Sequence, residues 1–182
     1  LEAGEKMAVY AFEGYWKDVG TVDSLWEAHM DLLDGSDLDL YDNSWKIYSR
    51  SPVMPPHVVE AGAKIKGSMV TEGCTVGGKV ERSVLFAGVT VEKGAEIKES
   101  IVMPGATVKA GARLYKTIVG ENAVIGENAV IGADEGKVTL IGPEAAVFQH
   151  RLQKDLPDKP EHWHKHRISR QGKAVIHKAA VK

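Results

Sequence analysis

The histidines are the side chains of this sequence whose types and spacing best suit metal chemistry. His162, His164 and His166 alternate along the chain, so in a strand they would share one face, where imidazole nitrogens bind soft divalent metals. Neither the spacing of these ligands nor a supporting acid indicates a dedicated site. We therefore interpret residues 148–182, which are rich in lysine and arginine, as a solvated basic tail.

The sequence has one cysteine, Cys74, which cannot form an internal disulfide. It follows a glycine within a repeated pattern, at a position that favours small buried residues, so we expect a structural thiol rather than a nucleophile. A reducing, cytoplasmic setting fits this composition. No apolar run reaches the length of a membrane span, and no basic face interleaved with aromatic residues indicates nucleic acid as a partner.

A glycine-punctuated six-residue repeat predicts the elements that would position any functional group. Its clearest copies begin at Gly62, Gly73, Gly88, Gly94, Gly105, Gly111, Gly120 and Gly126. In each copy a small residue and an aliphatic residue follow the glycine, which we expect to supply the unusual backbone angles of a corner. Because each short strand must stack on its neighbours to bury its apolar side, the pattern predicts a left-handed parallel β-helix over residues 58–147.

The residues before the repeat have a different pattern. Met7–Phe12 has the apolar content of a strand, and residues 23–33 have helical periodicity, with Ser24 and Glu27 as a capping box or with Thr21 or Asp23 as the cap. A strand and a helix cannot bury their own apolar surface. We therefore expect residues 1–34 to be the terminal βα element of a larger domain, with the helix face exposed in this chain, followed by a proline-rich linker over residues 35–57.

Two strings of residues carry a family resemblance. Phe12-Glu-Gly-Tyr-Trp-Lys-Asp-Val-Gly-Thr21 and Leu25-Trp-Glu-Ala-His-Met-Asp-Leu-Leu33 resemble the end of the catalytic domain of bacterial glucose-1-phosphate adenylyltransferases. The linker string Leu40-Tyr-Asp-Asn-Ser-Trp-Lys-Ile-Tyr48 and the repeat are similar to the linker and β-helix domain of that family. The resemblance covers roughly residues 1–147.

The resemblance implies a reaction, in which ATP and glucose 1-phosphate give ADP-glucose and pyrophosphate for glycogen synthesis. Nucleotidyl transfer of this kind needs Mg²⁺ and basic groups to neutralise charge on the attacking and leaving phosphates. By the resemblance, Asp18 helps to hold the metal and Trp16 lies beside the sugar. From the residues alone, Asp18 is interpreted as a turn or cap residue and Trp16 as a core residue, and only the resemblance favours metal contact for Asp18.

The family also implies partners and regulation. Its β-helix domain contributes to a homo-oligomer, expected to be a tetramer, and to pockets for phosphorylated effectors, near which Arg113 and Lys116 fall. From the residues alone this basic pair is a set of solvated charges on a corner. A non-catalytic partner subunit accompanies the enzyme in some bacteria and lacks the Asp-Val-Gly-Thr string, which this chain retains at Asp18–Thr21.

The sequence departs from the family by what it does not contain. The glycine-rich nucleotide loop, the basic substrate residues and the second metal carboxylate of the family lie upstream of the matching segment, outside these 182 residues. We therefore expect this chain alone to be inactive.

Two other classes of protein share the repeat. Hexapeptide acyltransferases need a histidine base, and carbonic anhydrases of this fold need three histidines around zinc. The sequence has no histidine between Val58 and Gln149, which argues against both. A stand-alone structural assembly module is the remaining alternative.

Overall fold

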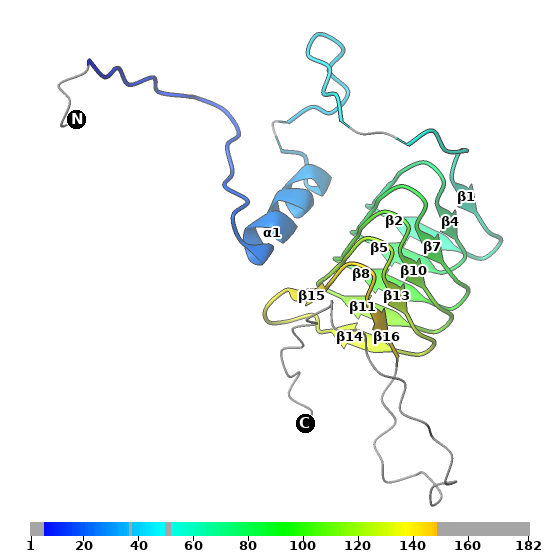
Figure 1. The fold of residues 1–182 in the computed structure, drawn as a ribbon. Helices are drawn as coiled ribbons and strands as arrows, with labels where there is room; N and C mark the ends of the chain where they lie inside the picture. The colour runs from blue at the N-terminus through cyan, green and yellow to red at the C-terminus, as the bar shows by residue number, and fades with distance from the viewer. Residues whose placement is uncertain (1–5, 37, 50–51, 149–182) are drawn as a thin grey trace, which may run out of the picture.

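The computed structural model describes residues 6–36, 38–49 and 52–148, which form one helix, α1 (Val22–Leu33), and a stack of short strands (Figure 1). The first sheet contains, in spatial order, β1 (Val58–Val59), β4 (Thr75–Val76), β7 (Thr90–Val91), β10 (Thr107–Val108), β13 (Val124–Ile125) and β16 (Ala146–Val147). The second contains β14 (Val130–Gly132), β11 (Arg113–Tyr115), β8 (Glu96–Lys98), β5 (Lys79–Glu81) and β2 (Lys64–Lys66). The third contains β15 (Thr139–Ile141), β12 (Thr117–Val119), β9 (Ile101–Val102), β6 (Val84–Leu85) and β3 (Met69–Val70).

The chain visits the three sheets in turn, so each strand pairs in parallel with the strand that follows three places later. In the first sheet Thr90 lies opposite Thr107, and Thr107 lies opposite Val124, so one coil there takes 17 residues. The three sheets form the walls of a β-helix (Figure 1). The predicted fold class, a left-handed parallel β-helix of hexapeptide repeats, is confirmed.

The interior of the β-helix is a continuous stack of aliphatic side chains. Its largest fully buried members include Leu85, Ile97, Leu114 and Ile125. Cys74 is part of this stack, as expected, and burial raises the pKa of its thiol. A neutral, buried thiol is a poor nucleophile, so Cys74 fills space in the core.

Glycine does not occupy every corner. The copies that begin at Gly62 to Gly111 place glycine at positive φ, but in the last two copies the left-handed residues are Asn122 (φ 54°) and Asn128 (φ 55°). The prediction that Gly120 and Gly126 form corners is therefore wrong. Asparagine adopts the left-handed region at a small energetic cost. Gly120 is needed for another reason, because a Cβ atom at this position would clash with the backbone nitrogen of Pro143.

A hydroxyl ladder, formed by Ser68, Ser83, Ser100 and Thr117, runs along the corner before the third sheet. The backbone N–H of each of the last three members donates to the hydroxyl of the member one coil earlier, at 3.0–3.1 Å. Each hydroxyl donates in turn to the carbonyl two residues earlier, at 2.7–2.9 Å. The ladder thus pairs polar groups that would otherwise be buried without partners.

The N-terminal segment differs from the expectation in one respect. Residues 6–12 form no strand, because no described segment pairs with them, and they run away from the β-helix (Figure 1). The predicted strand Met7–Phe12 is thus wrong for this chain. The helix is confirmed and runs from Val22 to Leu33, with Thr21 as its N-cap. The capping box is formed by Thr21 and Ser24, whose side chains each accept the backbone N–H of the other residue, and not by Ser24 and Glu27.

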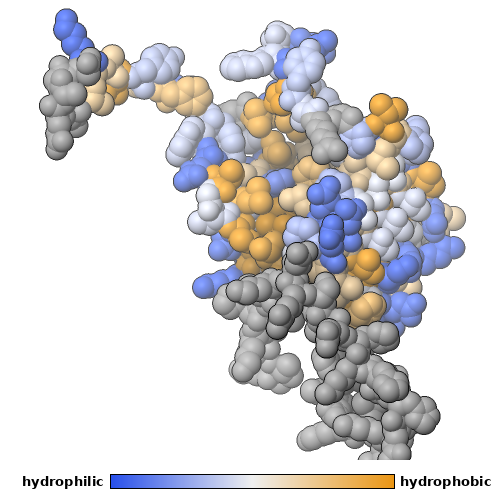
Figure 2. Space-filling view, viewed as in Figure 1, coloured by the Kyte–Doolittle hydropathy of each residue, from blue (hydrophilic) through white to orange (hydrophobic). Residues whose placement is uncertain are grey.

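The apolar face of α1 packs against the outer side of the third sheet. Met30 is buried against Ile101 and Ile118, in a cluster that also includes Leu25, Trp26, Leu33, Phe86, Met103 and Val138. In Figure 2 hydrophobic side chains gather where α1 meets the β-helix. The expectation that this face is exposed is wrong, because the outward residues of β9 and β12 are themselves apolar and form a matching surface.

We expect Ser100→Ala to lower the free energy of unfolding by about 1–3 kcal/mol, since it leaves the buried N–H of Thr117 without a partner. The carbonyl of Lys98 keeps its hydrogen bond from the backbone N–H of Lys116, at 3.1 Å. Ser100→Thr should be close to neutral, because Thr117 already occupies the same position one coil later. Urea denaturation followed by circular dichroism measures both effects.

The matched control for this prediction is Ser44→Ala, which removes an exposed hydroxyl that donates to Asp42 and should change stability by less than about 0.5 kcal/mol. Equal losses for Ser44→Ala and Ser100→Ala would contradict the role given to the ladder.

Candidate functional site

The two residues proposed for metal and sugar contact lie in one short segment with alternating exposure. Tyr15 and Lys17 are half-buried against α1, whereas Trp16, at 77% exposure, and Asp18 face solvent. Alternate residues of an extended chain point to opposite sides, so the contacts of Tyr15 and Lys17 leave Trp16 and Asp18 on the outward side. The alternative interpretation of Trp16 as a core residue does not hold.

The inward residues of this segment meet at one carboxylate of α1. The hydroxyl of Tyr15 donates to Oδ2 of Asp31 at 2.9 Å, and Nζ of Lys17 donates to the same oxygen at 2.7 Å. The ammonium also lies 3.3 Å from Oε2 of Glu27. We call Tyr15, Lys17 and Asp31 the Asp31 cluster.

The protonation states within the Asp31 cluster reinforce one another. The hydrogen bond from Lys17, followed by that from Tyr15, lowers the pKa of Asp31, and the bond to Asp31 raises the pKa of Lys17. Desolvation, followed by the bond to Asp31, raises the pKa of Tyr15. At neutral pH the cluster is therefore an ionised carboxylate held by an ammonium and a neutral phenol.

Asp18 suits a hard cation. Its Oδ1 accepts a hydrogen bond from the backbone N–H of Gly20 at 3.0 Å, which fixes the carboxylate in a turn and so also bears out its interpretation as a turn residue. Carboxylate oxygens are the ligands that Mg²⁺ prefers. Within the described residues no group of three or more histidine, cysteine or carboxylate side chains could hold a metal ion, and metal binding by Asp18 stays a prediction.

The opposite face of α1 contacts a row of corner residues on the β-helix. This corner row consists of Arg82, Glu99 and Lys116, all at positive φ. Nε1 of Trp26 donates to the carbonyl of Glu99 at 2.7 Å, and Nζ of Lys116 lies 4.9 Å from the centre of the Trp26 ring.

An ion pair adds to these contacts at the end of α1. Both terminal nitrogens of Arg82 donate to the carboxylate of Asp34, the second at 2.8 Å, so the pair is bidentate. The hydrogen bond from Arg82 lowers the pKa of Asp34. At the other end of the helix, the carboxylate of Asp23 accepts the backbone N–H of Val138 at 3.3 Å.

The proposed effector residues have different surroundings. Arg113 is exposed on β11, with its Nε 3.8 Å from Oε2 of Glu96. Lys116 lies at the corner beyond β11, with its ammonium over Trp26. The structure thus does not gather the two into one cluster, and effector binding stays a prediction for both.

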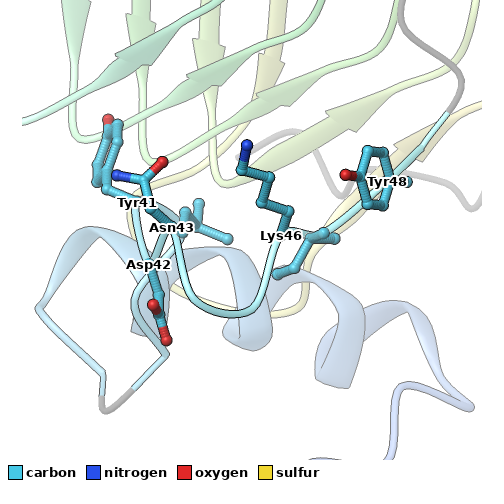
Figure 3. A pocket seen from close by; sticks show the side chains of 7 residues that line it. Tyr41, Asp42, Asn43, Lys46 and Tyr48 are labelled. Atoms are coloured by element: carbon cyan, nitrogen blue, oxygen red, sulfur yellow. The ribbon is translucent and has the colours of Figure 1, made fainter.

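A shallow pocket lies in the linker, lined by Leu40, Tyr41, Asp42, Asn43, Lys46, Ile47 and Tyr48 (Figure 3). All of these residues come from one loop. Oδ1 of Asp42 already accepts hydrogen bonds from the backbone N–H and the hydroxyl of Ser44, both at 2.7 Å. In Figure 3 the side chain of Lys46 points away from that of Asp42. The polar groups do not converge, so the pocket does not form a site. The histidines 162, 164 and 166 lie outside the described residues.

Comparisons with known proteins match both parts of the chain. The family model described as nucleotidyl transferase matches residues 1–35, and the one described as GlmU-like, C-terminal hexapeptide matches residues 55–138. Glucose-1-phosphate adenylyltransferase of Bacillus mycoides is 49% identical over 148 residues, which is 81% of this chain and 37% of the relative. The resemblance to glucose-1-phosphate adenylyltransferases is confirmed.

Other glucose-1-phosphate adenylyltransferases are similar to this chain as well. That of Bacillus cereus gives the same 49% identity over 148 residues, and that of Clostridium perfringens is 59% identical over 96 residues, or 52% of this chain and 25% of the relative. The chain thus spans about a third or less of the length of these relatives. No helix in the described part of the chain is long and apolar enough to cross a bilayer.

Sequence reasoning missed the Asp31 cluster and the corner row. A signal for the docking of α1 was present in the strands of the third sheet, where Val84-Leu85, Ile101-Val102 and Ile118-Val119 are apolar at consecutive positions. A strand that is apolar on both faces is buried on both faces. One face lines the interior of the β-helix, and the other requires a covering element, which is α1.

The Asp34–Arg82 pair predicts a pH dependence. The pKa of Asp34 in the folded protein lies below its ordinary value of 3.8, so the pair stabilises the fold fully above that pH and loses its effect as the pH falls through the folded-state pKa. We expect Asp34→Asn to have a lower thermal unfolding midpoint than the parent at pH 7, with the difference vanishing in acid.

Thermal unfolding of both proteins between pH 2.5 and pH 7, in ~0.1 M salt, measures this difference. Asp39→Asn is the matched control, because Oδ1 of Asp39 accepts a hydrogen bond within its own loop, from Tyr41. A difference for Asp34→Asn that is the same at both ends of the range would show that the pair contributes nothing through its charge.

Proposed function

We propose that this chain is part of an enzyme that transfers the adenylyl group of ATP to glucose 1-phosphate, giving ADP-glucose and pyrophosphate for glycogen synthesis. The observation that carries the proposal is the nucleotidyl transferase match over residues 1–35, the segment that presents Trp16 and Asp18 together. The 148 aligned residues of the Bacillus relatives exceed the length of the β-helix, so their similarity extends beyond it.

In the proposed reaction Asp18 and Trp16 have separate roles. The Oδ2 atom of Asp18 would hold Mg²⁺, while Oδ1 remains bonded to the N–H of Gly20 and orients the carboxylate. When bound, Mg²⁺ would neutralise charge on the phosphates during attack at the α-phosphorus. The exposed indole of Trp16 offers a flat apolar surface, against which one face of the glucose ring would pack.

We also propose that this chain alone is inactive. One carboxylate cannot hold the metal and both substrates. The described residues contain no cluster of three or more metal ligands, and the sequence contains no glycine-rich phosphate loop. The missing groups would come from the rest of the enzyme.

The acyltransferase alternative receives no support from the described residues. Two described histidines lie near the β-helix. His57 directly precedes β1 and is exposed, and the ring of His29 of α1 packs edge-on against Phe86 with a centroid distance of 5.8 Å. Its Nδ1 lies 2.8 Å from the carbonyl of Leu25. A ring held within this interface is poorly placed to take a proton from an acceptor substrate.

The proposed activity is tested in a chimera in which residues 1–148 of this chain replace the aligned part of the Bacillus cereus enzyme. We expect the chimera to form ADP-glucose in the presence of Mg²⁺ and the 182-residue chain to form none. Asp18→Asn should lower kcat by about 10²–10³-fold, because a charge that stabilises the transition state is lost. Trp16→Ala should mainly raise the KM for glucose 1-phosphate.

Asp42→Asn is the control for Asp18→Asn, since Asp42 is also an exposed turn aspartate but belongs to the linker. An Asp18→Asn chimera with the kcat of the parent would remove Asp18 from the metal site, and a chimera that forms no ADP-glucose would overturn the proposed reaction.

Assembly and regulation complete the proposal: the β-helix would build a homo-tetramer in the cytoplasm, with or without a non-catalytic partner subunit, and would bind phosphorylated effectors through Arg113 and Lys116. Support comes from the ends of the β-helix, where the last strands lack neighbours among the described residues and Val58, Val59, Leu140 and Phe148 are exposed.

We expect the active chimera to sediment as a tetramer, and Arg113→Ala to weaken its response to sugar phosphates without changing its sedimentation coefficient. Lys79→Ala, which removes another cation paired with Glu96 on the same sheet, is the control. A monomeric active chimera, or an unaltered response in Arg113→Ala, would contradict the corresponding half of the proposal.

A further inference from the structure

The segment that carries Trp16 and Asp18 is joined to the rest of the molecule at few points. Among the described residues, Asp18 accepts the N–H of Gly20 within its own turn. The other side-chain hydrogen bonds that link residues 6–19 to the rest of the chain are those of Tyr15 and Lys17, and both end on Oδ2 of Asp31. The second salt bridge of Lys17, to Glu27, is longer and involves a more exposed carboxylate. The position of the segment therefore depends on one side chain of α1.

We propose that Asp31 is a positioning residue for the adenylyl transfer reaction: it holds Tyr15 and Lys17 so that Trp16 and Asp18 are presented together on the outward side. This inference rests on the proposed function. Asp31 touches neither substrate nor metal in this arrangement, and it acts through its two partners.

The geometry suits this role because two donors from alternate residues converge on one acceptor. A single contact would leave the segment able to rotate about it. Two contacts, at Tyr15 and Lys17, fix both the position of the segment along α1 and the direction of its side chains. The side chain of Lys17 is 24% exposed and that of Asp31 is 36% exposed. This partial burial limits the screening of their attraction by water.

The helix that bears Asp31 is itself fixed. Met30, the neighbour of Asp31, is buried on the β-helix, and Trp26 donates to the carbonyl of Glu99. A functional group positioned from a packed helix is held more accurately than one positioned from a loop. The corner row of the β-helix, α1 and the Asp31 cluster thus form a continuous connection to Trp16 and Asp18.

A test of position that needs no activity uses the 182-residue chain labelled with 5-fluorotryptophan. Trp16→Phe and Trp26→Phe assign two of the ¹⁹F resonances. We expect Asp31→Ala to narrow the Trp16 resonance to its width in the urea-denatured chain, because the segment is then released from α1. The Trp26 resonance, which reports the docking of α1, should stay unchanged. Asp39→Asn is the control and should change neither. An unchanged line width of the Trp16 resonance in Asp31→Ala would overturn the proposal.

A second test uses the chimera with the Bacillus cereus enzyme. Asp31→Ala should lower kcat/KM by about 10–100-fold and raise the Mg²⁺ concentration for half-maximal activity, because Asp18 is displaced while its carboxylate is intact. Lys17→Ala should do the same, and the double variant should be no worse than the more affected single variant, since both remove one contact. A simple loss of stability would not change the Mg²⁺ dependence of the folded fraction.

The outcomes separate the two proposals. A chimera that forms no ADP-glucose defeats the proposed function, and the Trp16 resonance then still decides whether Asp31 positions the segment. An active chimera in which Asp31→Ala keeps its kcat/KM and its Mg²⁺ dependence defeats the positioning role alone.

Discussion

The hydroxyl ladder is the interaction on which the arrangement of this chain depends. The hydroxyls of Ser68, Ser83 and Ser100 each accept an N–H from the next coil and donate to a carbonyl of their own coil. One oxygen atom thus contributes both to the spacing of the coils and to the shape of the corner. The residue just before each of Ser83, Ser100 and Thr117 lies at positive φ, and these residues are Arg82, Glu99 and Lys116. At other corners glycine or asparagine takes that conformation, except at Glu144. Here long side chains do, which gives the β-helix a row of groups that can bind another element.

That row determines how α1 docks, but the apolar cluster provides more of its stability. Burial of a side chain such as Met30 contributes about 1.5–3 kcal/mol, whereas exposed ion pairs contribute little. The bidentate Arg82–Asp34 pair, the bond from Trp26 to Glu99 and the contact of Lys116 are directional, so they select one orientation of the helix among those that would bury Met30. That orientation turns Asp31 toward Tyr15 and Lys17 and away from the β-helix.

The β-helix was predictable from sequence because its repeat is short and every coil repeats the same burial pattern. The identity of the last corners was not, since asparagine replaces glycine at φ 54° and 55° while nearby glycines serve close packing. The strand expected at Met7–Phe12 failed because strand propensity is realised only when a neighbour supplies hydrogen bonds. The docking of α1 depends on contacts such as Trp26–Glu99, which joins residues 73 positions apart, and helical periodicity carries no information about them.

In the candidate site, too, features that depend on neighbouring residues in the sequence were predictable, and features that depend on distant residues were not. Trp16 and Asp18 were identified from a string of residues, and their common outward direction follows from alternation along an extended chain. Arg113 and Lys116 are also close in sequence, yet a corner of the β-helix separates them. Arg113 belongs to the outer surface of the second sheet beside Glu96, and Lys116 belongs to the docking surface of α1.

In a solenoid, proximity in sequence brings side chains together only along one strand, whereas proximity across coils brings together residues about 17 positions apart. Glu96 and Arg113, Ser83 and Ser100, and the members of the corner row are all related in this second way, and it is along these columns that the β-helix places its interacting groups.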